Sequence, residues 1–341
     1  MSGETSESPY AGAAAAVAEQ PDALRALKSK PVLVSGAAGL VGRHTCEELT
    51  KAGWKVRAFV RNPSKAAMRL AHLPVELQVG DVRNRDSVEK AMAGCGSVVH
   101  LAAVAIEKKG ESYEDVNTAG TKALLDAARS AGVDRFIYMS QNGADSSSRY
   151  SFLRSKGLGQ NAVATAGLSH TILRPSVIFG PEDEFVNVLA RLVRLSPLIY
   201  PLPDGGRARF QPIAVRDVAK AVRVSLEKQA TRRGTYSIGG PTPLSLREMT
   251  ERILAAMGVK RKIISIPVAA LRPVIALAAK TIPNPPVTPG LLDLLSLDNT
   301  VPDNALAPVF GITPTPFAPD ELQYLRRITA SDALSSLFKT R

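Results

Sequence analysis

Short apolar segments rich in β-branched residues alternate with longer segments of helical periodicity from residue 31 onward. The short segments have the length and composition of buried strands. They are PVLVSG (31–36), WKVRAFV (54–60), VELQVG (75–80), SVVHLAA (97–103), RFIYMS (135–140) and HTILRPS (170–176). The segments between them, such as NTAGTKALLDAARSAG (117–132), repeat apolar residues at helical spacing and often end in glycine. This alternation predicts an α/β fold with a doubly wound parallel sheet that helices cover on both faces.

The first predicted strand runs directly into the sequence GAAGLVG, which places glycines at positions 36, 39 and 42. Glycine is required where the backbone turns tightly, approaches a pyrophosphate closely and packs a helix onto the sheet. The helix that starts near Leu40 and Val41 would then offer its free N–H groups and its positive dipole end to the phosphates. A merely structural turn is the alternative, but the position of the loop after the first strand favours a Rossmann-type dinucleotide site.

The end of the second strand indicates which dinucleotide is bound. An NAD site places an acidic residue there to hold the ribose 2′-hydroxyl, whereas this chain has Arg61. A guanidinium binds a 2′-phosphate in a bidentate manner, and a carboxylate would repel it. Arg43, directly after the third glycine, could supply a second cation. Either arginine could instead be a solvated surface residue, so NADP(H) is the expected cofactor and NAD(H) stays open.

These patterns divide the chain into four predicted parts. Residues 1–29 are polar and alanine-rich with early acids, which fits neither a signal peptide nor a transit peptide; we expect a flexible tail that could end in one short helix. Residues 30–180 form the dinucleotide-binding Rossmann core. Residues 181–330 complete that core and form a smaller C-terminal lobe for a substrate or partner, and residues 331–341 are a tail.

Composition limits the function classes. Hydrophobic residues make up 45% and charged residues 22%, which is typical of a globular protein. Cys46 and Cys95 cannot form a disulfide framework, and the four histidines stand alone, so no metal site is expected. The net charge of +12 would suit nucleic acid or an anionic membrane. Because the basic residues are spread along the chain, a solvated surface with an anionic cofactor site is preferred and no specific nucleic-acid partner is expected.

Several longer motifs make the chain resemble the extended or atypical short-chain dehydrogenases/reductases over residues 31–330. They are SGAAGLVGRH (35–44), GDVRNRDSV (80–88), VVHLAA (98–103), VNTAGT (116–121), YMS (138–140) and ILRPSVIFGP (172–181). The resemblance implies a mostly structural role for Asn117. It places these residues around the cofactor: Asp81 and Val82 by the adenine, Leu101, Ala102 and Ala103 along the cleft, and Pro175, Ser176 and Val177 beside the nicotinamide.

Within that group the chain is most similar to the nucleotide-binding accessory subunit of respiratory complex I and its bacterial relatives. The similarity rests on SSSRYSFLRSKGLGQNAV (146–163), FGPEDEFVN (179–187), FQPIAVRDVAKAV (210–222) and LLDLLSLDNTVPDNAL (291–306). It implies firm NADPH binding and a structural or regulatory role. Some bacterial members are oxidoreductases or epimerases, so an enzyme acting on a small or isoprenoid substrate is the alternative.

The catalytic device of the family is altered in this chain. In active members a tyrosine transfers the proton and a serine orients the carbonyl. A lysine four residues after the tyrosine lowers the pKa of the tyrosine and holds the nicotinamide ribose. Lys156 and Ser140 match the lysine and the serine, but Phe152 occupies the tyrosine position and has no proton to donate. Tyr150 is rotated away from that helix face and could act only if its loop swings inward. We therefore expect cofactor binding with weak or no turnover.

The segment ISIPVAALRPVIALAAKTIPNPPVTPG (264–290) is apolar but interrupted by Arg272, Lys280 and several prolines. It is too interrupted for a membrane span, and Pro273 would break or kink a long helix. It could be a helix of the small lobe or an apolar surface for a membrane or partner. We expect a cytoplasmic protein that attaches peripherally to the inner face of a membrane, through a membrane protein complex or anionic lipid.

Overall fold

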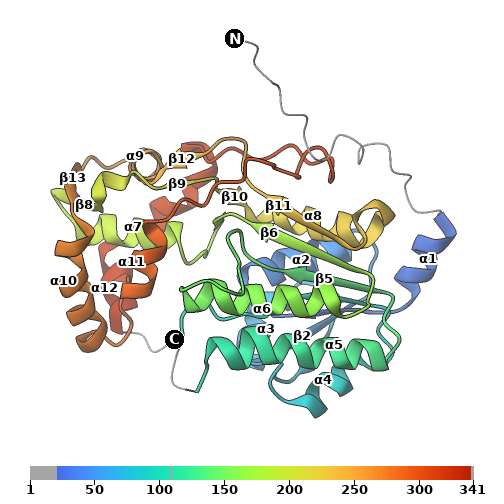
Figure 1. Cartoon of the computed structure of the whole chain (residues 1–341). Coiled ribbons are helices and arrows are strands. Elements are labelled where there is room, and N and C mark those ends of the chain that lie inside the picture. Colours follow the sequence, from blue (N-terminus) through green and yellow to red (C-terminus); the bar gives the residue numbers. More distant parts are fainter. Residues whose placement is uncertain (1–20, 108–109, 339–341) are drawn as a thin grey trace, which may run out of the picture. The chain divides into compact units, whose positions relative to one another are not determined.

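The computed structural model describes residues 21–107 and 110–338 and divides the chain into two compact units, each described by itself (Figure 1). Three separate segments build each unit. The first unit contains the chain up to Pro175 together with Val215–Ile238 and Pro302–Thr313, and the second contains Ser176–Ala214, Gly239–Val301 and Pro314–Arg341.

A parallel sheet of seven strands forms the centre of the first unit. The strands are β1 (Val32–Ser35), β2 (Val56–Val60), β3 (Val75–Val79), β4 (Ser97–His100), β5 (Arg135–Met139), β6 (His170–Pro175) and β11 (Gly234–Ile238). Their order is β11-β6-β5-β4-β1-β2-β3, and every neighbouring pair is parallel. The predicted doubly wound sheet is therefore confirmed. The strand order reverses between β1 and β4, and such a reversal is where these sheets bind ligands.

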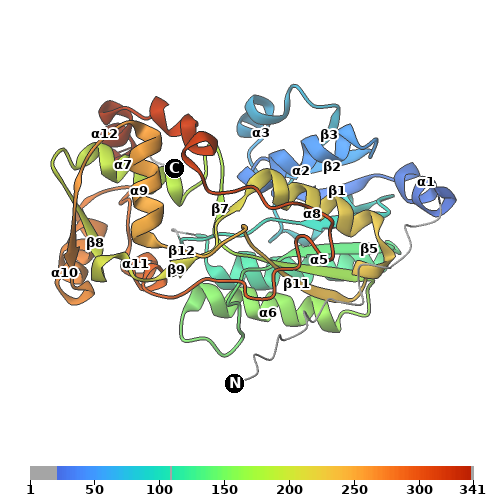
Figure 2. The ribbon, with the colours of Figure 1, turned by 90° about the horizontal axis from the view of Figure 1, so that it is seen from above.

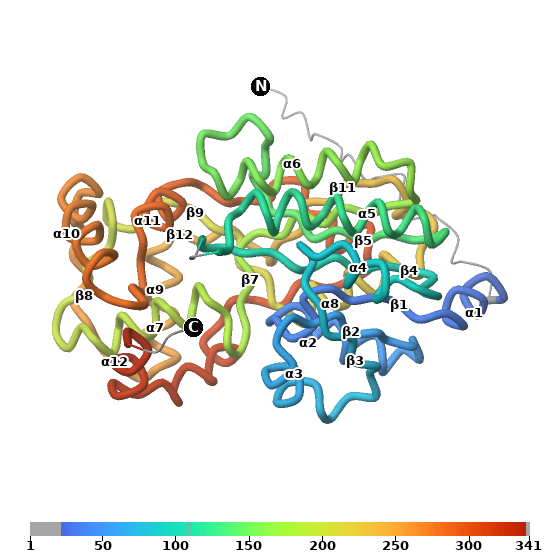
Figure 3. Tube along the Cα trace, turned by 90° about the horizontal axis from the view of Figure 1, so that it is seen from below, coloured from blue at the N-terminus to red at the C-terminus, as the bar shows by residue number. Residues whose placement is uncertain are grey.

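Helices cover both faces of this sheet. They are α2 (Leu40–Lys51), α3 (Pro63–Leu70), α4 (Arg85–Met92), α5 (Gly120–Ser130), α6 (Ser151–Thr165) and α8 (Val215–Glu227). A further short helix, α1 (Pro21–Ser29), precedes β1. Figures 2 and 3 show α5 and α6 on one side of the sheet and α2 and α8 on the other. The middle strands β1, β4 and β5 are buried along their whole length, because both of their faces are covered.

The pairing of α8 with α2 closes one face of the sheet. Arg223 on α8 bonds Glu48 on α2 through Nε at 2.8 Å. Behind α8, the buried Arg135 of β5 donates to the carbonyl of Ser225 from both Nε (3.1 Å) and Nη2 (2.7 Å). A buried guanidinium is tolerated only when its donors are satisfied, so these bonds fix α8 against the strands.

The unit boundaries differ from the predicted ranges. The first segment of the first unit ends at Pro175 rather than at residue 180. The unit also includes residues 215–238, because β11 pairs with β6 at the edge of the sheet. The predicted N-terminal tail contains α1, whose Lys28 donates to the carbonyl of Ala52 at 2.7 Å; residues 1–20 lie outside the described residues. Most of the predicted C-terminal tail is helical rather than free, because it lies in α12 (Ala330–Phe338), where Ala333 is buried.

The second unit combines short strand pairs with helices. Its strands are β7 (Ile178–Phe179), β8 (Ile199–Pro203), β9 (Arg209–Phe210), β10 (Ile213–Ala214), β12 (Leu244–Ser245) and β13 (Lys262–Ile266). Its α-helices are α7 (Val186–Leu195), α9 (Leu246–Met257), α10 (Val268–Thr281), α11 (Pro289–Leu295) and α12. Strands β8 and β13 are parallel, and α7 packs against both α9 and α12.

Helix α10 forms most of the apolar segment singled out in the sequence. It continues through Pro273, so of the two expected effects of this proline, a break or a kink, the break does not occur. The proline removes the N–H that would bond the carbonyl of Ala269, but no residue of α10 is buried, and water can reach that carbonyl. No helix among the described residues is long and apolar enough to cross a membrane.

Candidate functional site: a dinucleotide cleft in the first unit

The glycine loop between β1 and α2 is built as its sequence predicts. Gly36 has a left-handed backbone (φ 71°), and a Cβ there would lie 2.8 Å from the backbone nitrogen of Ala102. A Cβ on Gly42 would lie 2.2 Å from the carbonyl oxygen of Gly36. Both positions exclude any side chain, because such contacts are far inside van der Waals distance. The loop therefore brings α2 and the end of β4 into direct contact with the turn.

The start of α2 can accept an anion. Gly39 is its N-cap and offers no side chain to the first N–H groups, which include those of Leu40 and Val41. One turn into the helix, Arg43 carries a buried Nε that has no hydrogen-bond partner within the described residues. Unsatisfied donors of this kind are costly unless a ligand pairs with them. A dinucleotide pyrophosphate fits both features, since it is an anionic acceptor.

A cleft of about 160 Å³ opens at the ends of the neighbouring strands. It combines residues that the sequence analysis assigned separately to four loops. Its lining consists of Gly36, Phe59, Arg61, Gly80, Asp81, Val82, Ala102, Ala103, Val104 and Val116. Leu101 lies beside this lining, where its N–H donates to the carbonyl of Ser35 at 3.2 Å. The structure thus brings the predicted adenine-side residues together at the reversal of strand order.

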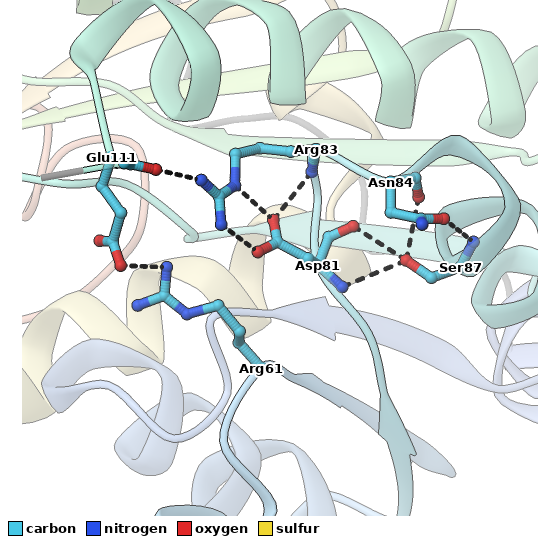
Figure 4. A network of polar contacts seen from close by, with 7 residues as sticks. Arg61, Asp81, Arg83, Asn84, Ser87 and Glu111 are labelled. Atoms are coloured by element: carbon cyan, nitrogen blue, oxygen red, sulfur yellow. Dashed lines mark hydrogen bonds and ion pairs between the residues drawn. The ribbon is translucent and has the colours of Figure 1, made fainter.

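Figure 4 shows a network of charged side chains around Arg61 and Asp81, two residues that line this cleft. Arg61 pairs with Glu111 (Nη1–Oε1 2.7 Å), and Asp81 pairs with Arg83 (Oδ2–Nη2 2.7 Å). Hydrogen bonding to Arg83 holds the pKa of Asp81 below its usual value, although partial burial opposes this effect. Arg83 also donates to the carbonyl of Gly110 at 2.5 Å. The carboxylate of Asp81 is thus ionised and neutralised by Arg83, which leaves Arg61 and Glu111 as the pair that a ribose substituent would meet.

Glu111 was not identified from the sequence. It lies in the loop between β4 and the π-helix Glu114–Ala119, outside any motif, and only the folded loop brings it to Arg61. Its carboxylate can compete with a 2′-phosphate for the guanidinium, because both are anionic acceptors. No sequence signal in the segment 105–112 could have indicated this pairing.

Phe152, Lys156 and Gln160 follow one another at intervals of one turn on the face of α6 that carries the predicted catalytic positions. Lys156 is buried, donates to the carbonyl of Met139 at 2.6 Å and lies 4.7 Å from the centre of the Tyr138 ring. Ser140, the residue after β5, donates its hydroxyl to Oε1 of Gln160 at 3.0 Å. Phe152, one turn before Lys156, contacts the ring of Tyr113 at a centroid distance of 5.7 Å. The sequence analysis identified neither Gln160 nor Tyr113.

Burial lowers the pKa of Lys156 to about 7. The lysine is therefore close to half-protonated at neutral pH in the free protein. An anionic cofactor beside it would favour the protonated form, since opposite charges raise the pKa of an amine.

Tyr150 does not share this face. It is the N-cap of α6, and its hydroxyl accepts a hydrogen bond from Nη2 of the exposed Arg149 at 2.6 Å. The Arg149 guanidinium also lies 4.8 Å from the centre of the Tyr150 ring. Tyr150 thus lies just before the helix, and the inward swing of its loop stays a prediction.

The remaining predicted positions divide between the two units. Pro175 ends β6, and its carbonyl accepts from the N–H of Asn142 at 3.0 Å. Ser176 and Val177 belong to the second unit: the Ser176 hydroxyl donates to the carbonyl of Asn299 at 2.7 Å, and the Val177 carbonyl accepts from Ile213. Their predicted place beside the nicotinamide stays a prediction.

Two buried polar residues, Asn117 and His100, form hydrogen bonds close to the cleft. Asn117 holds the backbone of Val104 through both its amide oxygen (2.9 Å) and nitrogen (3.1 Å), the structural role that the resemblance implies. His100 bonds Ser35 (2.7 Å) and Thr121 (2.9 Å), and complete burial lowers its pKa to about 3, so the ring is neutral. Within residues 21–107 and 110–338, no group of three histidine, cysteine or acidic residues is placed to hold a metal ion.

Comparisons with known proteins agree with this site. Residues 36–191 match the model of a family described as NAD(P)H-binding. The chain is 30% identical over 290 residues to the mitochondrial NADH dehydrogenase (ubiquinone) 1 alpha subcomplex subunit 9 of Arabidopsis thaliana, which covers 80% of this chain and 71% of the relative. It is 33% identical over 189 residues to the ceramide reductase of Caulobacter vibrioides, which covers 55% of this chain and 58% of the relative.

Among solved structures, the NADPH-dependent quinone oxidoreductase of Escherichia coli complexed with NADPH matches with a TM-score of 0.66. The match covers 85% of this chain and 98% of the other at 18% identity. At that identity the likeness shows the fold alone, a fold that holds a nicotinamide dinucleotide in the solved protein.

Proposed function

Because the chain belongs to the NAD(P)H-binding, epimerase-like short-chain dehydrogenases/reductases, the family that includes the alpha subcomplex subunit 9 of NADH dehydrogenase (ubiquinone), we propose that it is an NADP(H)-binding accessory protein with weak or no hydride transfer. Phe152 carries this proposal. It stands one helical turn before Lys156, where the family's proton donor would be, and its ring packs on Tyr113 instead of presenting a hydroxyl.

Different residues would bind the different parts of the cofactor. The N–H groups of Leu40 and Val41 and the guanidinium of Arg43 hold the diphosphate, and Arg61 releases Glu111 to bind the 2′-phosphate. Lys156 donates to the nicotinamide ribose. The bound nicotinamide supplies a hydride, but the chain offers no acid at position 152 to complete a carbonyl reduction.

Association with a membrane protein complex at the inner face of a membrane is part of the proposal. Three observations support it: the relative named above is a subunit of NADH dehydrogenase, the net charge is +12, and the second unit exposes apolar side chains on α10. A basic, partly apolar surface favours anionic membranes and complexes embedded in them.

Titration and turnover measurements on the same sample test the proposal. The protein should bind NADPH yet reduce carbonyl substrates very slowly, since a positioned general acid contributes about 10²–10⁴-fold to the rate. Phe152→Tyr adds only a hydroxyl beside Lys156 and should raise any turnover at least about tenfold. Tyr150→Phe and Tyr113→Phe are the controls and should change nothing.

The second candidate is an NAD(P)-dependent reductase or epimerase acting on a small or isoprenoid substrate. It is favoured by the retained Ser140 and Lys156, and by the similarity to a ceramide reductase, which extends the substrate class to lipids. Under this reading another phenol donates the proton. Substantial NADPH-dependent turnover that disappears in Tyr150→Phe or in Tyr113→Phe would establish the enzyme and overturn the accessory role.

A further inference from the structure

The second unit contains a cavity of about 320 Å³, which is within the range of small-molecule sites, roughly 300–1,000 Å³. Side chains from α7, β8, α9, α10, α11 and α12 line it. The lining residues include Val188, Leu192, Leu202, Ile275, Leu295 and Leu337. The cavity belongs entirely to the second unit, so it is separate from the dinucleotide cleft of the first.

The lining offers almost nothing to a polar ligand. Apart from Glu184 and Tyr200, every lining side chain is apolar. Tyr200 is buried and donates its hydroxyl to the carbonyl of Leu189 at 3.4 Å, and Glu184 is an exposed residue that contributes to the rim. Apolar cavities of this kind exclude water and bind hydrocarbon, because no group inside replaces the hydrogen bonds of water.

Helix α10 is a thin wall between this cavity and the outside. Leu271, Ile275, Ala278 and Ile282 line the cavity at helical spacing. Away from that face, Val274 and Leu277 are 65% and 64% exposed, and the helix has no buried residue. A helix that is apolar on several sides and covered on only one is poorly suited to water and well suited to the acyl region of a membrane surface.

Basic residues accompany these apolar ones. Lys280 lies on α10 itself, and Lys260, Arg261 and Lys262 precede or begin β13, the strand paired with the cavity-lining β8. Arg272, also on α10, already pairs with Asp293 of α11. Lysine and arginine beside exposed apolar side chains are the arrangement that binds the headgroups of anionic lipids while the apolar groups enter the membrane.

We propose that the cavity holds one hydrocarbon chain of a membrane lipid while the outer face of α10 contacts the membrane surface. The volume fits this occupant, because about 320 Å³ is at the lower end of the range of small-molecule sites, roughly 300–1,000 Å³. It is too small for a peptide helix, whose diameter with side chains is about 10–12 Å. The proposal does not depend on whether the first unit transfers hydride.

Binding of cis-parinaric acid, a fatty acid with a fluorescent chain, to the full-length protein tests the cavity. We expect saturable binding of one chain per molecule. Ala278→Phe fills the cavity from α10 and should weaken that binding at least tenfold. Ala270→Phe makes the same change at an exposed position of α10 that does not line the cavity, and should leave binding unchanged.

A series of straight-chain alcohols, measured by displacement of the probe, keeps the proposal testable if Ala278→Phe does not fold. Affinity should rise about fourfold per methylene group, the equivalent of about 0.8 kcal/mol, and should level off once the chain fills the cavity. NADPH titration of each variant reports whether the first unit is intact. Affinity that rises without limit, or that is equal in Ala278→Phe and the unmodified protein, overturns the proposal.

Vesicles distinguish a membrane lipid from a free fatty acid. Phosphatidylcholine vesicles with 20% phosphatidylglycerol and a parinaroyl-chain phosphatidylcholine should transfer the probe to the protein, again with loss in Ala278→Phe. Uptake of the free acid but not of the phospholipid chain would overturn the membrane source. The protein could instead be a dimer without lipid that Leu277→Ser converts to a monomer. That result would show that the exposed face of α10 contacts a second copy of the chain.

Discussion

The two cavities of this protein are built in opposite ways. The cleft of the first unit is made by backbone at strand ends, with glycines that leave no room for a side chain and charged residues at one end. The cavity of the second unit is made mainly by aliphatic side chains from six elements, α7, β8, α9, α10, α11 and α12. A backbone-built site constrains particular residue types at fixed spacing, whereas a side-chain-built cavity needs only apolar residues of suitable size. The first is therefore visible in the sequence and the second is not.

The largest expected effect is that of Gly42→Ala, which should weaken ligand binding in the first unit alone. Gly42→Ala places a Cβ 2.2 Å from the carbonyl oxygen of Gly36, so the loop and α2 must move apart. NADPH affinity should fall at least about 100-fold, the equivalent of about 2.8 kcal/mol, while parinaric acid binding to the second unit is unchanged. Gly290→Ala, where an added Cβ meets nothing within 4 Å, is the matched control in calorimetric titrations. Simultaneous loss of both ligands would show that the cavities are not independent.

Six of the seven strands of the first unit could be predicted because each is a short, strongly apolar segment. The seventh, β11 (GTYSI), escaped prediction: it lies after a long segment of the second unit, and its glycine, threonine and serine give it little apolar character. Pro273 shows a second limit of prediction from sequence, since the helix continues through it. An internal proline loses one hydrogen bond and clashes with the carbonyl four residues earlier, at a cost of about 3 kcal/mol, but this is a cost and not a prohibition. The other residues of α10 include many alanines and leucines, which are strong helix formers.

The second prediction concerns the charged end of the cleft. NADPH should bind at least about tenfold more tightly than NADH, the equivalent of about 1.4 kcal/mol, because Arg61 pairs with the 2′-phosphate. Arg61→Ala should remove this difference by weakening NADPH alone. Arg85→Ala, at an exposed arginine paired with Glu89, serves as the control. Equal affinities in the unmodified protein would contradict the assignment of NADP(H).

The third prediction follows from Lys156. Its pKa is about 7 in the free protein, and a bound anionic cofactor should raise it, so binding takes up a proton. NADH affinity should therefore be constant well below pH 7 and fall above it, by up to about tenfold between pH 6 and pH 8. NADH is chosen because it lacks a 2′-phosphate, which titrates near pH 6. Lys156→Met should bind less tightly and show no such dependence in the same titrations.

Of the proposed catalytic and cofactor positions, the sequence could predict only those that have a counterpart in a motif, such as Gly36, Asp81 and Lys156. It could not identify Glu111, whose pairing with Arg61 depends on the path of a loop. Gln160 was missed for another reason: it lies on α6 in a helical register, but only the distance to Ser140 reveals that it holds that hydroxyl.

The smallest expected effect is that of Glu111→Gln. Arg61 is 53% exposed, and pairs of this kind contribute about 0.2–1 kcal/mol. Removing the competing carboxylate should therefore tighten NADPH binding by up to about fivefold, while NADH binding stays the same or weakens. Competition titrations of the two nucleotides measure the ratio. Weaker NADPH binding in this variant would mean that Glu111 positions Arg61 for the phosphate instead of competing with it.

The interleaving of the two units imposes an order on folding during synthesis. A nascent chain that has emerged as far as Pro175 has six strands of the sheet, but α8, which closes the face beside α2, begins only at Val215. The ribosome needs roughly 2–8 s to add Ser176–Ala214 at 5–20 residues per second, far longer than a helix or hairpin takes to form. During that interval the part of the face that α8 later covers stays exposed beside α2, and exposed apolar surface of this kind is prone to aggregation.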